Sequence, residues 1–178
     1  MDQPKKTSTL PKFRSDCPRF YICDYCNALL IGSSRVGHGN SELAPSRCCG
    51  QPMRELVPRQ ASDASDELVH RPMMTITGGF EHNTVVVHVG ADPRHPHPMT
   101  SDHYVDWIWL RSFEGGHLKY LNPGQDPEAS FALSDEDAFG YCDQPICKMG
   151  RGHCMFQCKR GYAAYAHCTK HGLWMFIF

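Results

Sequence analysis

Residues 103–110 have the sequence His-Tyr-Val-Asp-Trp-Ile-Trp-Leu, which is dominated by β-branched and aromatic residues. Such residues favour β-strands, whose side chains alternate between two faces. A two-residue period places four side chains on one face: His103, Val105, Trp107 and Trp109. Thr84–Val89 alternates in the same way, with valine at every second position. We therefore predict half-buried strands at residues 104–110 and Thr84–Val89.

Further candidate strands lie on either side of these two. They cover residues 73–77, 117–121 and 128–133, and they are bounded by turns such as Gly78-Gly79 and Asn122–Pro127. Short strands at this spacing, without a convincing amphipathic helix, are typical of a β-sandwich. We therefore expect a mainly β protein with a sandwich over residues 68–178.

The part of the chain before this sandwich has a different character. It contains Cys23-Asp-Tyr-Cys26, a loop rich in Gly and Ser, and Cys48-Cys49. We expect a small metal-binding domain at residues 17–57, followed by a polar linker at 58–67. Residues 1–16 are polar and lack the apolar stretch of a secretory signal, so we expect a disordered tail. Asp2 weakens the alternative of an organelle-targeting peptide.

Composition limits the classes of partner. The formal net charge is −1, so the molecule has no strong field that would attract nucleic acid or anionic lipid. No apolar run is long enough to cross a bilayer. Ten cysteines among 178 residues fall below the roughly 8–10% that indicates a disulfide scaffold. Without a signal peptide, a reducing cytoplasmic location and metal ligation are expected.

The first cysteine group has the spacing of a metal site. Cys23 and Cys26 form a knuckle, and the adjacent pair Cys48 and Cys49 completes four thiolates. Iron and zinc suit such ligands about equally. Neighbouring cysteines that point at one ion are expected to distort the tetrahedron. The alternative is a zinc knuckle that only holds a small domain together.

A second donor set combines four histidines with one cysteine. Cys168 and His171 lie in Tyr165-Ala-His-Cys-Thr-Lys-His-Gly-Leu-Trp174, and the other three donors lie upstream: His70, His97 and His103. Five such ligands leave one octahedral position open on a redox-active iron. His95 is an alternative to His97, although the Pro-Met after His97 favours the latter. Five other histidines are expected to be ordinary core or surface residues: His82, His88, His117, His153 and His167.

A third cysteine group occupies an apparent insertion at residues 141–160. Its members lie within 17 residues: Cys142, Cys147, Cys154 and Cys158. A third centre containing zinc or iron, two disulfides and free thiols all remain open for this group. Cys17 has no assigned partner.

Two motifs resemble the desulfoferrodoxin family. Phe20-Tyr-x-Cys-x2-Cys followed by Cys48-Cys-Gly-Gln-Pro-Met53 looks like its desulforedoxin-type, rubredoxin-like domain. His97-Pro-Met-x3-His103-Tyr-x2-Trp-Ile followed by Cys168-x2-His-Gly-Leu-Trp174 resembles its superoxide reductase domain. The resemblance covers residues 20–53 and 70–174, with interruptions.

The resemblance implies an immunoglobulin-like sandwich that carries a square-pyramidal iron. The implied axial ligand is Cys168. The implied equatorial ligands are the four histidines: His70, His97, His103 and His171. It further implies one-electron reduction of superoxide to hydrogen peroxide, a rubredoxin-like electron donor and a homodimer.

One family feature is missing. Many members have Glu-Lys immediately before the first histidine ligand, where the lysine attracts superoxide, but this chain has Leu68-Val69. Glu67 is one position too early to replace the family glutamate. Arg71 and Lys170 are local candidates for a substitute positive charge.

Two other functions fit the same donors. A non-catalytic electron carrier or redox sensor would use the metal centres without reducing superoxide. A structural zinc protein would use two or three zinc knuckles, and it would be colourless.

Overall fold

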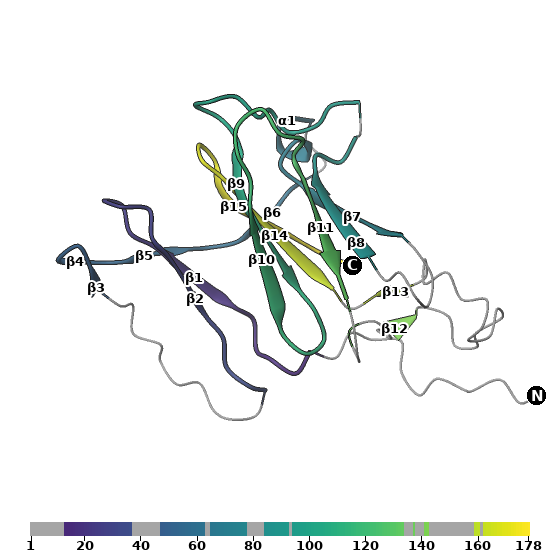
Figure 1. Ribbon diagram of the computed structural model, residues 1–178, viewed down its shortest axis with the longest axis horizontal. Helices are drawn as coiled ribbons and strands as arrows, with labels where there is room; N and C mark the ends of the chain where they lie inside the picture. Colours follow the sequence, from purple (N-terminus) through teal and green to yellow (C-terminus); the bar gives the residue numbers. More distant parts are fainter. Residues whose placement is uncertain are drawn as a thin grey trace, which may run out of the picture.

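A computed structural model describes residues 13–36, 47–62, 65–77, 84–92, 94–133, 137, 141–142, 159–160 and 162–178. Within these residues the regular structure is almost entirely β (Figure 1). The single helix, α1 (Ser65–Leu68), is four residues long. The described residues include no helix long and apolar enough to span a membrane.

Two sheets form the sandwich. The larger has the order β10-β9-β14-β15-β6, with the bounds β10 (Gly116–Tyr120), β9 (Val105–Arg111), β14 (Ala163–Cys168), β15 (Gly172–Ile177) and β6 (Arg59–Gln60). The smaller has the order β11-β8-β7, with the bounds β11 (Glu128–Ala132), β8 (Thr84–Val89) and β7 (Pro72–Thr77). The five strands expected from residues 73–133 are all present, shifted by at most one residue at an end. The expected β-sandwich is therefore confirmed.

Alternation in β8 builds the core between the two sheets. Val85, Val87 and Val89 are buried, whereas the residues between them are half-buried. They pack in one cluster with residues of β9, β11 and β14, including Leu110 and Phe131. Burying side chains of this size stabilises the fold by about 1.5–3 kcal/mol each.

A bulge in β9 changes the expected faces of this strand. His167 pairs with Trp107 but the next residue of β14, Cys168, pairs with Val105, so Asp106 is an extra residue. An inserted residue reverses the alternation on one side of a bulge. Val105 therefore joins the inner core, whereas Trp107 belongs to a cluster on the opposite face. The prediction that Val105 shares a face with both tryptophans was wrong for this reason.

The outer face of the large sheet is covered by the cysteine-containing segment. A three-stranded sheet with the order β2-β1-β5 contains β1 (Arg19–Ile22), β2 (Leu29–Gly32) and β5 (Arg54–Leu56). Phe20 of β1 is fully buried, and its ring lies 5.4 Å from that of Trp107 and 5.1 Å from that of Tyr165. This shared core explains why every residue of β14 is buried. The N-terminal unit and the sandwich thus stabilise each other.

The ends of the N-terminal unit also contact the sandwich. Residues 13–16 belong to the expected tail, yet Arg14 pairs with Glu114 at 2.8 Å, and the guanidinium of Arg111 lies 3.7 Å from the centre of the Phe13 ring. Residues 59–60 belong to the expected linker, and they form β6, which pairs with β15 in parallel. The segment between the two units is therefore part of the large sheet.

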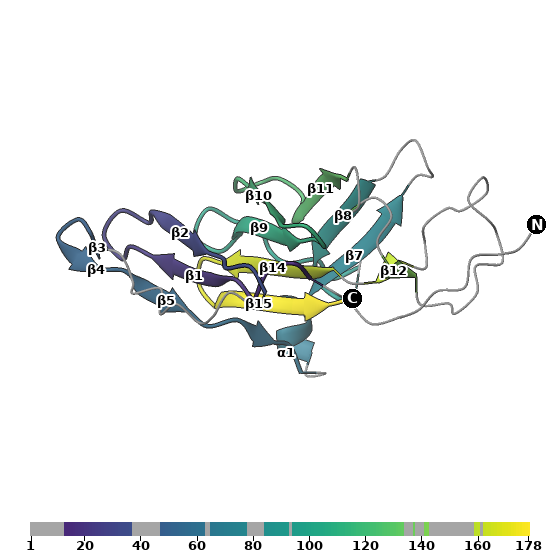
Figure 2. The ribbon, with the colours of Figure 1, turned by 90° about the horizontal axis from the view of Figure 1, so that it is seen from below.

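The cysteines of the first unit lie at one end of the molecule. β3 (Arg47–Cys48) and β4 (Gln51–Pro52) form a short antiparallel ribbon. Figures 1 and 2 both show this ribbon far from α1. The insertion contributes β12 (Tyr141–Cys142) and β13 (Lys159–Arg160), which pair with each other. The Cys142 side chain and residues Cys147, Cys154 and Cys158 lie outside the described structure.

Candidate metal centres

Four imidazole rings form a closed cycle at one end of the sandwich. Neighbouring ring centres in the order 70, 97, 103 and 171 are 5.0, 4.8, 4.8 and 4.6 Å apart. The planes of neighbouring rings meet at 74°, 77°, 72° and 74°. The four predicted histidines therefore face a common centre: His70, His97, His103 and His171.

The Cys168 sulfur belongs to the same group. Its Sγ atom lies 3.5 Å from Nδ1 of His171, which is 2.8 Å from Nε2 of His70. The possible ligand atoms of His70, His103, Cys168 and His171 all lie within 4.8 Å of one another. Cys168 ends β14 and His171 precedes β15, so a tight antiparallel turn brings both to the centre.

His70 is placed by backbone contacts at the end of α1. Its amide donates to the carbonyl of Glu67 at 2.9 Å, and the amide of Ala91 donates to the carbonyl of Leu68 at 2.9 Å. The Trp174 ring stacks on the His70 ring at 4.9 Å and 16°. These contacts fix both the backbone and the ring plane of His70.

His97 is held in the protonation state that a metal ligand needs. Its Nδ1 donates to the carbonyl of Pro98 at 2.6 Å, so Nε2 keeps a lone pair. Burial lowers the pKa of His97 to about 4, which keeps the ring neutral at pH 7. His95, by contrast, is exposed and lies 3.1 Å from Asp92. The geometry therefore favours His97 over His95.

A second set of backbone contacts joins His103 to the cysteine turn. The amide of Thr169 donates to the carbonyl of Tyr104 at 3.0 Å, and the amide of Tyr104 donates to the Thr169 hydroxyl at 3.2 Å. Burial lowers the pKa of His103, and the charges of His171 and Lys170 lower it further. His103 therefore also favours the neutral form.

The surroundings of Cys168 act on its thiol in opposite directions, and the net effect is a raised pKa. Burial raises the pKa of its thiol, whereas hydrogen bonds from the amides of His171 and Lys170 oppose the rise. The positive charges of Arg59 and Lys170 act in the same direction as those amides. These groups stabilise the thiolate, which is the form that binds metals.

The two cations expected near the site lie in different surroundings. Lys170 is part of the 168–171 turn, and its positive charge acts to lower the pKa of both Cys168 and His103. The Arg71 guanidinium donates to the carbonyl of Ala61 at 3.0 Å and lies over the Phe176 ring. Glu67 accepts a hydrogen bond from the amide of Ser62 at 2.7 Å. The half-buried apolar residues Leu68 and Val69 occupy the positions of the family's charged gate.

The donor atoms fit a bound cation. Nε2 of His97 and Nε2 of His103 are buried, and they have no hydrogen-bond partner among the described residues. A buried nitrogen without a partner is costly, and a metal ion at the centre of the four rings would satisfy both. Four imidazoles with one thiolate are soft to intermediate ligands, which suit iron.

The first cysteine group also converges. The four sulfurs of Cys23, Cys26, Cys48 and Cys49 lie within 4.8 Å of one another. Hydrogen bonds from the amides of Cys26 and Tyr25 lower the pKa of Cys23 to about 7. Hydrogen bonds with Cys26, Cys23 and Cys49 raise the pKa of Cys48 to about 12. Four thiols this close cannot all ionise without a cation to offset their charges.

Local backbone geometry lets adjacent cysteines share this centre. Cys49 has a φ of 49° and Asn27 a φ of 58°, and both values are uncommon for residues other than glycine. Strain of this kind collects at functional sites. The positive φ of Cys49 lets the two adjacent cysteines turn towards one centre, whereas the predicted distortion of the tetrahedron stays a prediction. Cys26 and Cys49 form a solvent-exposed edge of this group.

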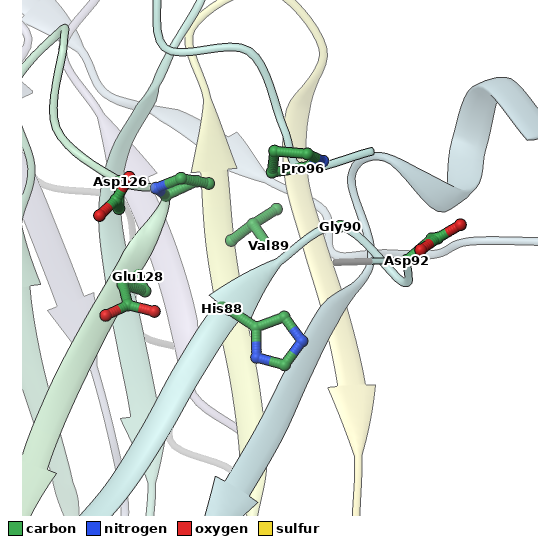
Figure 3. A pocket seen from close by; sticks show the side chains of 8 residues that line it. His88, Val89, Gly90, Asp92, Pro96, Asp126 and Glu128 are labelled. Atoms are coloured by element: carbon green, nitrogen blue, oxygen red, sulfur yellow. The ribbon is translucent and has the colours of Figure 1, made fainter. Parts of the chain in front are cut away.

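Another hollow lies at the end of β8 (Figure 3). Its titratable lining includes His88, Asp92, Asp126 and Glu128, and Figure 3 shows Asp92 apart from the other two carboxylates. Among the described residues, only the cysteine and histidine groups above bring three or more metal donors within 4.8 Å. This hollow is therefore no candidate metal centre.

Two residues that support the histidine centre were not singled out from the sequence. Gly90 has a φ of 117°, and a Cβ there would lie 3.0 Å from the carbonyl oxygen of His95. Arg59 packs on Trp174 from the expected linker, 4.2 Å from the ring centre. The only sequence signal that could have pointed to them was the position of Gly90 directly after the alternating strand 84–89.

The fold and the two donor sets define a class: a β-sandwich protein with one tetrathiolate centre and one centre of four imidazoles and a thiolate. The family model for desulfoferrodoxin matches residues 61–176. The chain belongs to the desulfoferrodoxin family.

Individual relatives agree with this assignment. A desulfoferrodoxin homolog of Methanothermobacter thermautotrophicus is 37% identical over 115 residues, which are 65% of this chain and 81% of that protein. One of Archaeoglobus fulgidus is 28% identical over 154 residues, which are 86% of this chain and 92% of that protein. An alignment of that length extends into the N-terminal cysteine unit.

Solved structures support the fold. The superoxide reductase from Treponema pallidum has a TM-score of 0.59 and 23% sequence identity, and the match covers 89% of this chain and 97% of that chain. At this identity the likeness concerns the fold alone.

Proposed function

We propose that this chain is a superoxide reductase, which reduces superoxide by one electron to hydrogen peroxide at a non-haem iron in defence against oxidative stress. The proposed ligands are four imidazoles and one thiolate: His70, His97, His103, His171 and Cys168. The observation that carries the proposal is the closed cycle of four rings beside the Cys168 sulfur.

A ferrous ion held by these residues would supply the electron that, with two protons, converts superoxide to hydrogen peroxide. The protein keeps the imidazoles neutral by burial, as the lowered pKa values of His97 and His103 indicate. One thiolate among neutral ligands leaves a net positive charge at a divalent cation, which attracts an anion. His171 is exposed, so water reaches this edge of the centre and can provide protons.

The tetrathiolate group is the proposed electron relay. Its ligands would hold an iron, or alternatively a zinc: Cys23, Cys26, Cys48 and Cys49. Exposure of Cys26 and Cys49 supports electron entry from an external donor, for which a rubredoxin-like protein is proposed. A cytoplasmic homodimer is the proposed form. The cysteines at 142, 147, 154 and 158 stay a proposed third site for zinc or iron.

The test uses anaerobically purified full-length protein. Iron and zinc per chain are measured, and the reduced protein is then titrated with superoxide while peroxide and oxygen are followed. We expect iron, peroxide and no oxygen. A colourless protein that contains only zinc would contradict the proposal and favour a structural role.

One alternative uses the same centres without catalysis. An electron carrier or redox sensor would exchange electrons with a donor protein, and superoxide would not oxidise its reduced form rapidly. The exposed tetrathiolate edge is the observation that favours this alternative. The yield of peroxide per oxidised iron separates the two functions.

A further inference from the structure

Arg59 lies outside both donor sets, yet it contacts two elements that hold the histidine centre. It begins β6 and pairs with Trp174 of β15. Its guanidinium carbon lies 4.2 Å from the centre of the Trp174 ring, and its Nη2 donates to the carbonyl of His171. One side chain therefore joins the expected linker to a strand and a turn of the metal centre.

The contact with Trp174 continues to a proposed ligand. The Trp174 ring stacks on His70 at 4.9 Å and 16°, and Trp174 is only 3% exposed. The indole and imidazole planes are nearly parallel, and the guanidinium carbon lies over the indole. Arginine supports such a contact better than lysine because its head group is planar. The ring plane of His70 depends on the position of Trp174, which Arg59 covers from outside.

Arg59 differs from its neighbours in having no carboxylate of a described residue at ion-pair distance, although its charge contributes to the lowered pKa of Glu67. Arg54, Arg59 and Lys170 line one open hollow beside His171. Arg54 pairs with a carboxylate at 2.8 Å and Lys170 with another at 2.7 Å. Among the described ion pairs within 4.0 Å, none involves Arg59.

We propose that Arg59 is a positioning residue of the iron centre, which fixes the Trp174–His70 stack and the turn of His171 while its charge raises the reduction potential. This inference rests on the proposed function. The oxidised centre carries one more positive charge than the reduced centre, so a nearby cation disfavours oxidation. Loss of Arg59 should therefore lower the potential and loosen the iron.

Two variants separate the contacts from the charge. Arg59→Gln removes both, whereas Arg59→Lys keeps the charge and loses the planar head group. Arg54→Gln is the matched control. Arg54 carries the same charge and lines the same hollow, but the contacts with Trp174 and His171 described above belong to Arg59. Circular dichroism checks the fold of each variant, and Arg59→Lys remains informative if Arg59→Gln does not fold.

The readouts are the release of iron to a ferrous chelator and the reduction potential of the iron bound by Cys168 and the four histidines. For Arg59→Gln we expect iron release at least threefold faster. We also expect a threefold shift of the redox equilibrium towards the oxidised form, which lowers the potential by about 28 mV at 59 mV per tenfold. Arg59→Lys should release iron faster at an unchanged potential. Arg54→Gln should match the wild type in both.

The outcomes distinguish this inference from the proposed function. A wild type without a thiolate-to-iron absorption band would overturn the iron centre itself. With that band present, wild-type iron release in both Arg59 variants would overturn the positioning role. Equal potentials in Arg59→Gln and Arg54→Gln would overturn the electrostatic role.

Discussion

Nζ of Lys170 lies 2.7 Å from Oδ2 of Asp102, so an ion pair joins the turn that carries His171 to the loop that carries His103. The pair is largely exposed, and Lys170 lowers the pKa of Asp102 to about 2. This carboxylate therefore stays charged at every pH at which the centre is expected to work, and it offsets much of the Lys170 charge. Lys170 therefore acts on the histidine centre as one member of an ion pair with Asp102, and its positive charge is partly offset.

Replacing Lys170 should weaken the attraction of superoxide. We expect Lys170→Gln to slow the second-order reaction by up to about fivefold at low salt, or roughly 1 kcal/mol, because the pair is exposed and screened. Asp102→Asn should speed it, since it releases the lysine charge. Lys119→Gln, a remote strand lysine, is the control. Pulse radiolysis at several ionic strengths measures the rates, and a wild-type rate insensitive to salt would leave no role for Lys170 or Arg71.

Gly90 should be required for the placement of His97. Its φ is 117°, and an added Cβ would lie 3.0 Å from the His95 carbonyl and 3.2 Å from the His97 amide. Gly90→Ala should cost about 1–3 kcal/mol of stability and reduce iron per chain at the histidine centre. Thermal unfolding and metal analysis measure both effects. Gly124→Ala, which also has a positive φ but adds no contact within 4 Å, controls for backbone strain alone. Equal iron loss in the two variants would contradict this role.

Cys168 should determine the absorption of the oxidised centre. Cys168→Ser removes the thiolate donor, so the thiolate-to-ferric band of the histidine centre should disappear while the four imidazoles remain. Any absorption from iron bound by the four cysteines of the first unit should persist. Cys17→Ser changes an exposed cysteine outside both donor sets and should keep the band. Absorption and iron content are measured on the same samples. If the band of the histidine centre survived in Cys168→Ser, its thiolate donor would have to be another residue.

His167 should make the stability of the metal-free protein depend on pH. Burial lowers its pKa from 6.5 to about 4, so the unfolded chain binds a proton that the folded chain does not. Its stabilising contribution is fully present above pH 6.5 and is lost as the pH falls towards 4, by at most about 1.4 kcal/mol per pH unit. His167→Phe keeps a ring against Trp107, which His167 contacts at 5.3 Å. Denaturant unfolding from pH 4 to 7 should show a smaller slope for this variant, and an equal slope would contradict the prediction.

Phe20 should couple the two units of the chain. Its ring is fully buried against Trp107 and Tyr165 of the large sheet. Phe20→Ala should cost about 3–5 kcal/mol and lower the unfolding temperature of both units together. Leu30→Ala in the neighbouring strand, where the side chain is exposed, should cost much less. Signals from the two metal centres follow each unit, and separate transitions in the wild type would contradict a shared core.

Several features were accessible from the sequence because they depend on local periodicity and spacing. Alternation in 84–89 located β8 with both of its ends, and Cys23-x2-Cys26 with Cys48-Cys49 predicted the four sulfurs that converge. The five donors of the histidine centre were also named, and the structure brings their rings and sulfur together. Their role as iron ligands stays a prediction.

Other features depended on contacts between distant segments. The bulge at Asp106 could not be predicted from a two-residue period, because it appears only in the pairing of β9 with β14. The role of Arg59 was hidden in a segment that looked like a linker, since its partners lie more than 100 positions away. The sequence by itself determined which chemical groups this protein carries and which segments are strands. Only the tertiary structure decided which face each strand buries and which cation lies against the metal ligands, because both follow from packing across the whole chain.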